Sequence, residues 1–186
     1  MRILAISGSL RRDSHNSALL RAAAEKLPPG VELTIHDGLR EIPPYDDDEL
    51  ATPAPAVLRL REEIAAADGV LVSTPEYNSS IPGQLKNALD WMSRPLAESP
   101  LRNKPTAVIG ASTGMFGAVW AQAEARKVLG AIGARVIDTE LPVPAADDQF
   151  AEDGSLSDPD LEQELVAVLD ELVAAITARS EGAQAA

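Results

Sequence analysis

Cysteine is absent from the 186 residues of the chain, and histidine occurs only as His15 and His36. The missing thiols exclude disulfides, thiolate nucleophiles, iron–sulfur clusters and zinc sites built on cysteine. Aromatic residues are also scarce, at 3% of the chain. Any redox chemistry must therefore come from a bound cofactor.

Long hydrophobic runs and an excess of basic residues are missing as well. No apolar run is long enough to span a membrane, and the segment 1–7 is too short for the apolar region of a signal peptide. The net charge of -13 argues against a nucleic-acid partner. We therefore expect a soluble cytoplasmic protein that binds neither membranes nor nucleic acids.

Apolar segments alternate along the chain with segments of helical periodicity. The expected strands are 3–6, 31–35, 69–73, 106–111 and 135–139, and the expected helices are 17–27, 56–67, 84–91, 118–132 and one from 158. This alternation is typical of an α/β fold with a doubly wound parallel sheet and helices on both faces. Polar residues alternate with apolar ones in the second strand, which suits an edge and favours the order 2-1-3-4-5. We predict one domain over residues 1–180 and a flexible tail at 181–186.

Three polar loops follow the first, third and fourth expected strands, where open α/β sheets place their ligands. The first loop, Gly8–Ser17, offers hydroxyls, an amide and Arg11 close to a helix N-terminus, which favours a bound phosphate. It matches neither the dinucleotide motif Gly-x-Gly-x-x-Gly nor a P-loop. The alternative is a helix capped by Ser14 or Asn16, with exposed arginines.

The other two loops suit a flat ring. In the second loop, Thr74–Ser80, backbone groups can reach the polar edge of a ring and Tyr77 can cover it, although its prolines could simply shape a turn. The third loop contains Gly-x-Ser-x-Gly at 110–114. A hydrolase nucleophile in that motif needs a later histidine, and both histidines come earlier, so we reject a catalytic triad. The N–H groups of Ser112, Thr113 and Gly114 are instead expected close to the ring or its sugar chain.

Two longer motifs resemble the NAD(P)H-dependent FMN reductase family, which includes flavodoxin-like quinone, chromate and azo-dye reductases. They are Gly-Ser-Leu-Arg-x-x-Ser-x-Asn at 8–16 and Thr-Pro-Glu-Tyr-Asn-x-Ser-x-Pro-Gly-x-Leu-Lys-Asn-Ala-Leu-Asp-Trp at 74–91. Shorter matches lie at 42–46 and 110–115, so the resemblance covers about residues 1–178. The chain departs from the family pattern at Asp13, an acid close to the phosphate, and at Trp120, where smaller residues are usual.

The resemblance implies a flavodoxin-like fold, bound FMN, and NADPH or NADH as hydride donor. The first loop would hold the FMN phosphate, the second would line the isoalloxazine and ribityl chain, and the third would contact the flavin. The candidate cofactor-binding residues are Ser9, Arg11, Ser14, His15, Asn16, Ser17, Pro75, Glu76, Tyr77, Asn78, Ser112, Thr113 and Gly114. No protein residue is expected to act as a catalytic group, and no metal site is expected.

The predicted activity is hydride transfer from the nicotinamide to the flavin and on to a small acceptor: a quinone-like, azo or metal-oxyanion compound, or free flavin. The alternative is a flavodoxin-like electron carrier that does not oxidise NAD(P)H. Such carriers usually cover both ring faces with aromatic residues, and the low aromatic content favours the enzyme. A homodimer or homotetramer is expected.

Overall fold

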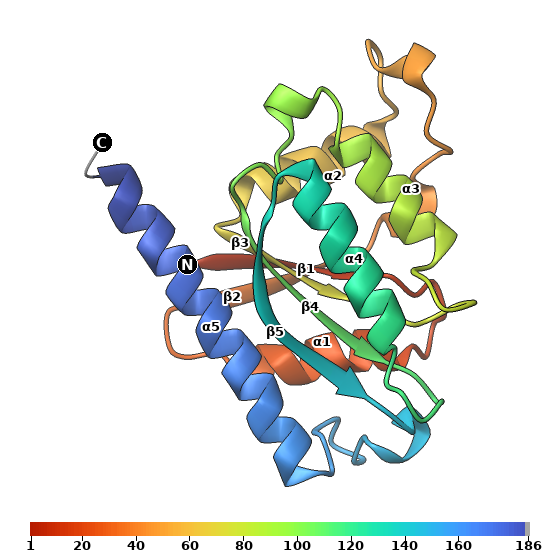
Figure 1. Cartoon of the computed structure of the whole chain (residues 1–186), viewed down its shortest axis with the longest axis vertical. Coiled ribbons are helices and arrows are strands. Elements are labelled where there is room, and N and C mark those ends of the chain that lie inside the picture. Colours follow the sequence, from red (N-terminus) through yellow and green to blue (C-terminus); the bar gives the residue numbers. More distant parts are fainter. Residues whose placement is uncertain (185–186) are drawn as a thin grey trace.

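The structure of the protein, a computed structural model, describes residues 1–184. Five parallel strands form one sheet in the order β2-β1-β3-β4-β5, which confirms the predicted fold class (Figure 1). The strands are β1 (Arg2–Ser7), β2 (Glu32–His36), β3 (Gly69–Ser73), β4 (Pro105–Ala111) and β5 (Arg135–Val143). The helices are α1 (His15–Glu25), α2 (Pro55–Ala66), α3 (Gly83–Met92), α4 (Val119–Ile132) and α5 (Pro159–Gln184).

The burial of each strand follows its place in the sheet. Every residue of β3 and β4 is buried, because helices cover both faces of these central strands. In β2, exposed residues alternate with half-buried ones as far as Ile35, and His36 is buried. This pattern is expected of a strand at the edge of a sheet. β5 forms the other edge and extends to Val143, four residues beyond the predicted end, with a register shift opposite β4 between Thr106 and Val108. The predicted end of this strand at residue 139 was therefore too early.

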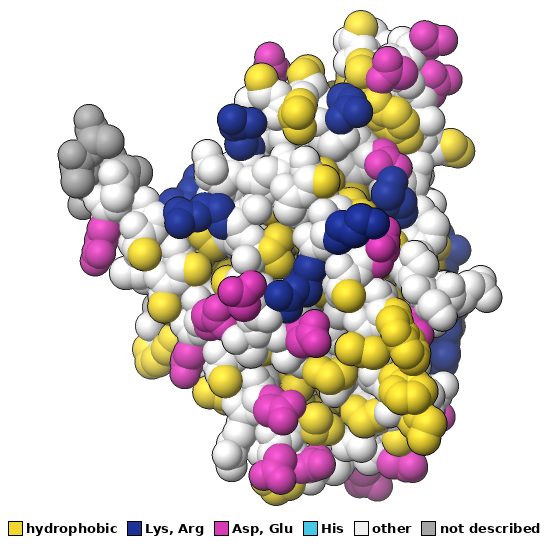
Figure 2. All heavy atoms as spheres, in the orientation of Figure 1, with side chains coloured by type: hydrophobic (Ala, Val, Ile, Leu, Met, Phe, Trp, Pro, Cys, Tyr) yellow, Lys and Arg dark blue, Asp and Glu magenta, His cyan; other side chains and the backbone are white. Residues whose placement is uncertain are grey.

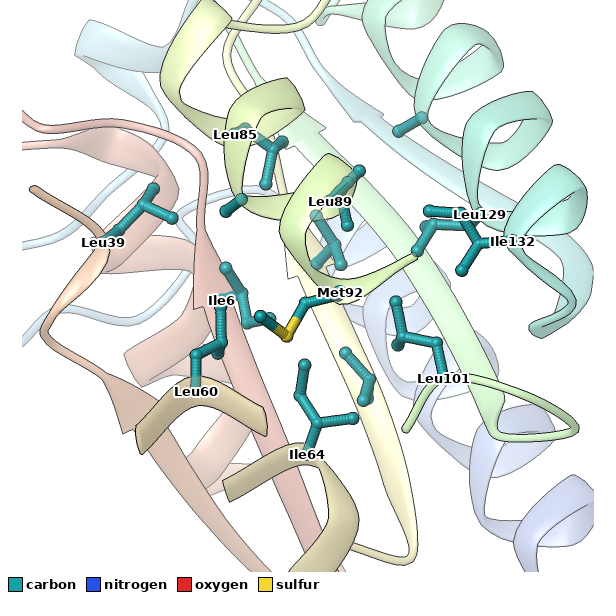
Figure 3. Packing of buried hydrophobic residues seen from close by; sticks show 14 of the residues in the cluster. Ile6, Leu39, Leu60, Ile64, Leu85, Leu89, Met92, Leu101, Leu129 and Ile132 are labelled. Atoms are coloured by element: carbon teal, nitrogen blue, oxygen red, sulfur yellow. The ribbon is translucent and has the colours of Figure 1, made fainter. Parts of the chain in front are cut away.

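Two hydrophobic clusters hold the layers together. Helices α2, α3 and α4 pack on one face of the sheet, and side chains such as Leu60, Leu89 and Leu129 fill the space between them and the strands (Figures 1 and 3). Helices α1 and α5 cover the other face, where Leu165, Leu169 and Ile176 of α5 are buried. Helix α5 extends to Gln184, and residues 185–186 lie outside the described part. The flexible tail at 181–186 stays a prediction.

Two buried side chains connect distant segments through hydrogen bonds to backbone carbonyls. The Trp91 indole Nε1 donates to the Pro43 carbonyl over 2.9 Å, which ties α3 to the long segment that follows β2. The Lys104 side chain enters the protein just before β4, where its Nζ donates to the Ala67 carbonyl over 2.5 Å at the C-terminal end of α2. Burial lowers the pKa of the Lys104 ammonium to about 8.

Candidate functional site

The three polar loops meet at the carboxyl edge of the sheet and enclose a cleft. Its wall consists of the predicted residues Ser9, Arg11, Ser14, His15, Asn16, Pro75, Glu76, Tyr77, Ser112 and Thr113, together with Ala111. The predicted residues Ser17, Asn78 and Gly114 stand outside this wall. Parallel strands bring segments that are far apart in the sequence to one edge, so this gathering follows from the sheet order.

The start of α1 provides an anion site at one end of the cleft. Ser14 has an extended backbone and caps the helix, since its Oγ accepts the Ser17 N–H over 3.4 Å. The helix therefore begins at His15, two residues before the predicted start. The first amides of a helix lack intrahelical partners and carry its positive dipole end. The exposed Arg11 side chain lies beside them in the wall of the cleft.

Asn16 is buried, and its side chain connects three elements. Its Oδ1 accepts the Ala111 N–H over 3.0 Å and the Ser73 hydroxyl over 2.8 Å, while its Nδ2 donates to the Ala111 carbonyl over 2.9 Å. The amide thus ties the first turn of α1 to the ends of β3 and β4. The groups that remain to bind an anion here are the backbone amides, the neighbouring hydroxyls and Arg11.

His15 lines the cleft and contacts a segment that the sequence analysis did not connect with the site. Its Nε2 lies 2.9 Å from Asp147 Oδ1, and its ring stacks on Phe150 with centroids 5.9 Å apart. Asp147 belongs to the short helix η4 (Ala146–Asp148) after β5. No local pattern links positions 15 and 147, because the contact depends on the pairing of distant strands.

The second loop makes a tight turn beside the cleft. Tyr77 and Ser80 exchange backbone hydrogen bonds of 3.0 and 3.2 Å around Asn78 and Ser79, which both have positive φ angles, of 53° and 59°. Two successive left-handed residues are typical of a type I′ turn. Tyr77 is 47% exposed at the rim of the cleft, and Asn78 lies at the exposed tip of the turn.

Glu76 has a structural partner that the sequence did not reveal. One carboxylate oxygen, Oε2, accepts the backbone N–H groups of Trp120 and Ala121 over 3.1 and 3.2 Å. These amides belong to the first turn of α4, where the preceding residue Ala118 has a left-handed backbone and provides no side-chain cap. The carboxylate therefore supplies the missing cap from the facing loop and fixes the start of α4 against the second loop.

The third loop lies against the second because Gly110 has no side chain. A Cβ at this position would stand 2.8 Å from the Thr74 carbonyl oxygen. Within the loop, the Ser112 N–H donates to Val143 over 3.1 Å and the Gly114 N–H donates to Ser112 Oγ over 3.1 Å. Of the three amides predicted to face the ring, that of Thr113 is the one left available among the described residues.

Exposed hydrophobic side chains stand beside this loop. Phe116 and Trp120 are 55% and 48% exposed, and their rings meet edge to face with centroids 4.9 Å apart. Figure 2 shows hydrophobic side chains gathered over the N-terminal end of α4. Since Glu76 bonds to the Trp120 amide, this aromatic pair adjoins the cleft.

Residues 1–184 contain neither a cluster of metal-binding side chains nor a helix suited to a membrane. No group of three or more His, Asp or Glu side chains is arranged to hold a metal ion there. In the same part of the chain, no helix combines the length and the apolar character needed to cross a bilayer.

Residues 1–148 match the family described as NADPH-dependent FMN reductase. The chain belongs to this family. It is 44% identical over 168 residues to an NAD(P)H-dependent FMN reductase of Pseudomonas aeruginosa, covering 89% of each protein. It is 38% identical over 141 residues to a quinone reductase of Escherichia coli, covering 74% of each. The solved structure of FerB, a flavoenzyme NAD(P)H:(acceptor) oxidoreductase from Paracoccus denitrificans, superposes with a TM-score of 0.84 at 35% identity, covering 95% of this chain and 97% of FerB.

Membership in the FMN reductase family confirms the prediction of a flavodoxin-like oxidoreductase that uses FMN and NAD(P)H. The donors of the cleft fit FMN, because the start of α1, the Ser9 and Ser14 hydroxyls and Arg11 suit a phosphate. The polar second and third loops flank the remainder of the cleft, where a ring would be held at its edges. The role of each predicted residue toward FMN stays a prediction.

Proposed function

We propose that this FMN reductase binds FMN in the cleft, with the phosphate over the start of α1 and the ring between the second and third loops. The observation that carries the proposal is the convergence of the helix N-terminus, Arg11 and both ring-flanking loops on one cleft. In this assignment, Ser9, Arg11 and Ser14 bind the phosphate, and Pro75, Tyr77 and Thr113 border the flavin. The other predicted residues Ser17, Asn78 and Gly114 are assigned to FMN binding as well, although they do not line the cleft.

Bound FMN supplies the redox chemistry: overall, NAD(P)H and a proton reduce a quinone to a hydroquinone and release NAD(P)+. The protein residues bind and orient the reactants, and none serves as a nucleophile. Their task is to keep the reacting atoms about 3–3.5 Å apart. The Thr113 amide, which lines the cleft, would be free to donate a hydrogen bond to the edge of a bound ring.

We further propose that the physiological acceptors are flat, apolar molecules of the quinone class. The exposed pair of Phe116 and Trp120 beside the cleft supports this assignment, because aromatic faces bind planar rings. Replacing Trp120 with Ala is expected to raise the KM for a benzoquinone several-fold and to leave the KM for ferricyanide, which is a small polar acceptor, unchanged. Equal effects on both acceptors would contradict the role of this pair.

The first experiment measures FMN affinity by titration of flavin fluorescence. One charge-assisted hydrogen bond to a phosphate contributes about 1.5–3 kcal/mol, so Arg11→Ala is expected to weaken FMN binding about 10- to 100-fold. Arg135→Ala is the matched control, because this exposed arginine starts β5 at the opposite edge of the sheet. If both variants retained FMN as tightly as the parent protein, the phosphate assignment would be wrong.

The second experiment separates the enzyme from an electron carrier. Anaerobic NADPH is expected to bleach the flavin absorbance of the loaded protein rapidly, and steady-state plots for donor and quinone are expected to show parallel lines. A flavin that stayed yellow with both NADPH and NADH would support the carrier instead. We also propose that the enzyme works in the cytoplasm, where NAD(P)H is supplied, as a homodimer or homotetramer, which light scattering would test.

A further inference from the structure

The first loop has a second hollow on the side that faces away from the cleft. This hollow, of about 350 Å³, lies between the loop, the exposed side of α1 and the carboxyl end of β2. Ser9 and Arg11 belong to the walls of both spaces, so one stretch of loop separates them. We call this space the β2 hollow.

The β2 hollow is strongly basic in a chain whose net charge is -13. Four arginines line it: Arg11, Arg12, Arg21 and Arg40. The carboxylate in its wall, Asp37, is paired with Arg59, which lowers the pKa of that carboxyl group. Arg40 also donates to the Leu10 carbonyl over 2.6 Å and so holds the loop in place. Such a concentration of guanidinium groups is suited to an anion.

A buried polar atom at the same place has no protein partner. The His36 side chain lines the β2 hollow with no exposed surface, and its Nδ1 lies 2.6 Å from Glu63 Oε2. The opposite ring nitrogen, Nε2, is buried and unpaired among the described residues. Gly38 packs next to this atom, since a Cβ at residue 38 would stand 3.2 Å from Nε2. Buried polar atoms are seldom left unpaired, which indicates a ligand at this position.

We propose that the β2 hollow is a second anion site that takes a phosphomonoester, and that its ligand during turnover is the 2′-phosphate of NADPH. This rests on the proposed function, which places FMN in the adjoining cleft. A dinucleotide carries its 2′-phosphate at the end remote from the nicotinamide, so a site on the far side of the loop suits that group. Arg12 and Arg21 bind the phosphate, and the enzyme prefers NADPH to NADH.

The test compares adenosine 2′,5′-bisphosphate with 5′-AMP by calorimetry on the FMN-loaded protein. The bisphosphate is expected to bind at least tenfold more tightly, and Arg12→Gln with Arg21→Gln is expected to remove this difference. The same double variant is expected to raise the KM for NADPH at least tenfold, because it removes both arginines assigned to the phosphate, while the KM for NADH changes less than twofold. Arg102→Gln with Arg135→Gln is the control for the loss of two positive charges, since both arginines are exposed and lie outside the walls of the cleft and the β2 hollow.

Gly38→Ala tests the site without changing charge. Its methyl group would occupy the space beside His36 Nε2, so bisphosphate affinity is expected to fall while FMN affinity is retained. Equal binding of bisphosphate and 5′-AMP by the parent protein would overturn the proposal. The parent protein could also bind inorganic phosphate while the double variant does not, with the KM for NADPH the same in both. That result would identify a free anion as the ligand and overturn the assignment to NADPH. Failure of FMN to bind would instead reject the proposed function, and the same bisphosphate titration on the FMN-free protein would then test the β2 hollow by itself.

Discussion

The cap that Glu76 provides for α4 leads to a quantitative prediction. Its Oε2 accepts the N–H groups of Trp120 and Ala121, and α4 has no other side-chain cap at this end. Loss of a helix cap costs about 0.5–2 kcal/mol, and the interaction of a carboxylate with the helix dipole adds about 0.3–1 kcal/mol. Because these two contributions overlap, we expect Glu76→Ala to lower the free energy of unfolding by about 1.5–2 kcal/mol.

The prediction is best checked by thermal denaturation of the FMN-free protein, so that a change in flavin affinity does not enter the measurement. In a protein of this size, about 1 kcal/mol shifts Tm by about 2–4 °C, so Glu76→Ala is expected to lower Tm by about 3–8 °C. Glu76→Gln keeps an oxygen acceptor and is expected to lose only about 0.5–1 kcal/mol.

Glu124→Ala serves as the control on the same helix, since Glu124 has one surface contact, to Lys127 at 3.6 Å. Its Tm is expected to stay within about 2 °C of the parent, because surface substitutions usually change stability by less than about 0.5 kcal/mol. An unchanged Tm in Glu76→Ala, or an equal loss in Glu124→Ala, would refute the reasoning.

Three further substitutions test the buried polar contacts. Asn16→Ala removes three hydrogen bonds and is expected to cost about 3 kcal/mol even without FMN, measured by urea unfolding. Trp91→Phe loses the bond to Pro43 and should cost about 1–2 kcal/mol in the same assay. Lys104 has a folded pKa of about 8, below its unfolded 10.5, so the unfolded state binds more protons between these values. The free energy of unfolding of the parent protein, minus that of Lys104→Met, should therefore rise by about 1–2 kcal/mol from pH 7 to pH 10.5. A difference that stayed flat or fell with pH would contradict this prediction.

Local patterns in the sequence were enough to predict the sheet and the edge at which three polar loops meet. Continuous apolar runs marked the central strands, the alternation in β2 marked an edge strand, and polar loops after three strands marked the end of the sheet that carries the cleft. These features depend on neighbouring residues, so they can be read without knowledge of the fold. The family motifs at 8–16 and 74–91 then indicated FMN, in agreement with the family match.

Only the tertiary structure decided which predicted side chains remain available to a ligand. Asn16 is engaged by Ala111, Glu76 by the start of α4, and His15 by Asp147. Each partner lies at least 44 residues away in the sequence. Such contacts form because parallel strands bring remote loops to one edge, and no local periodicity encodes which side chains then meet.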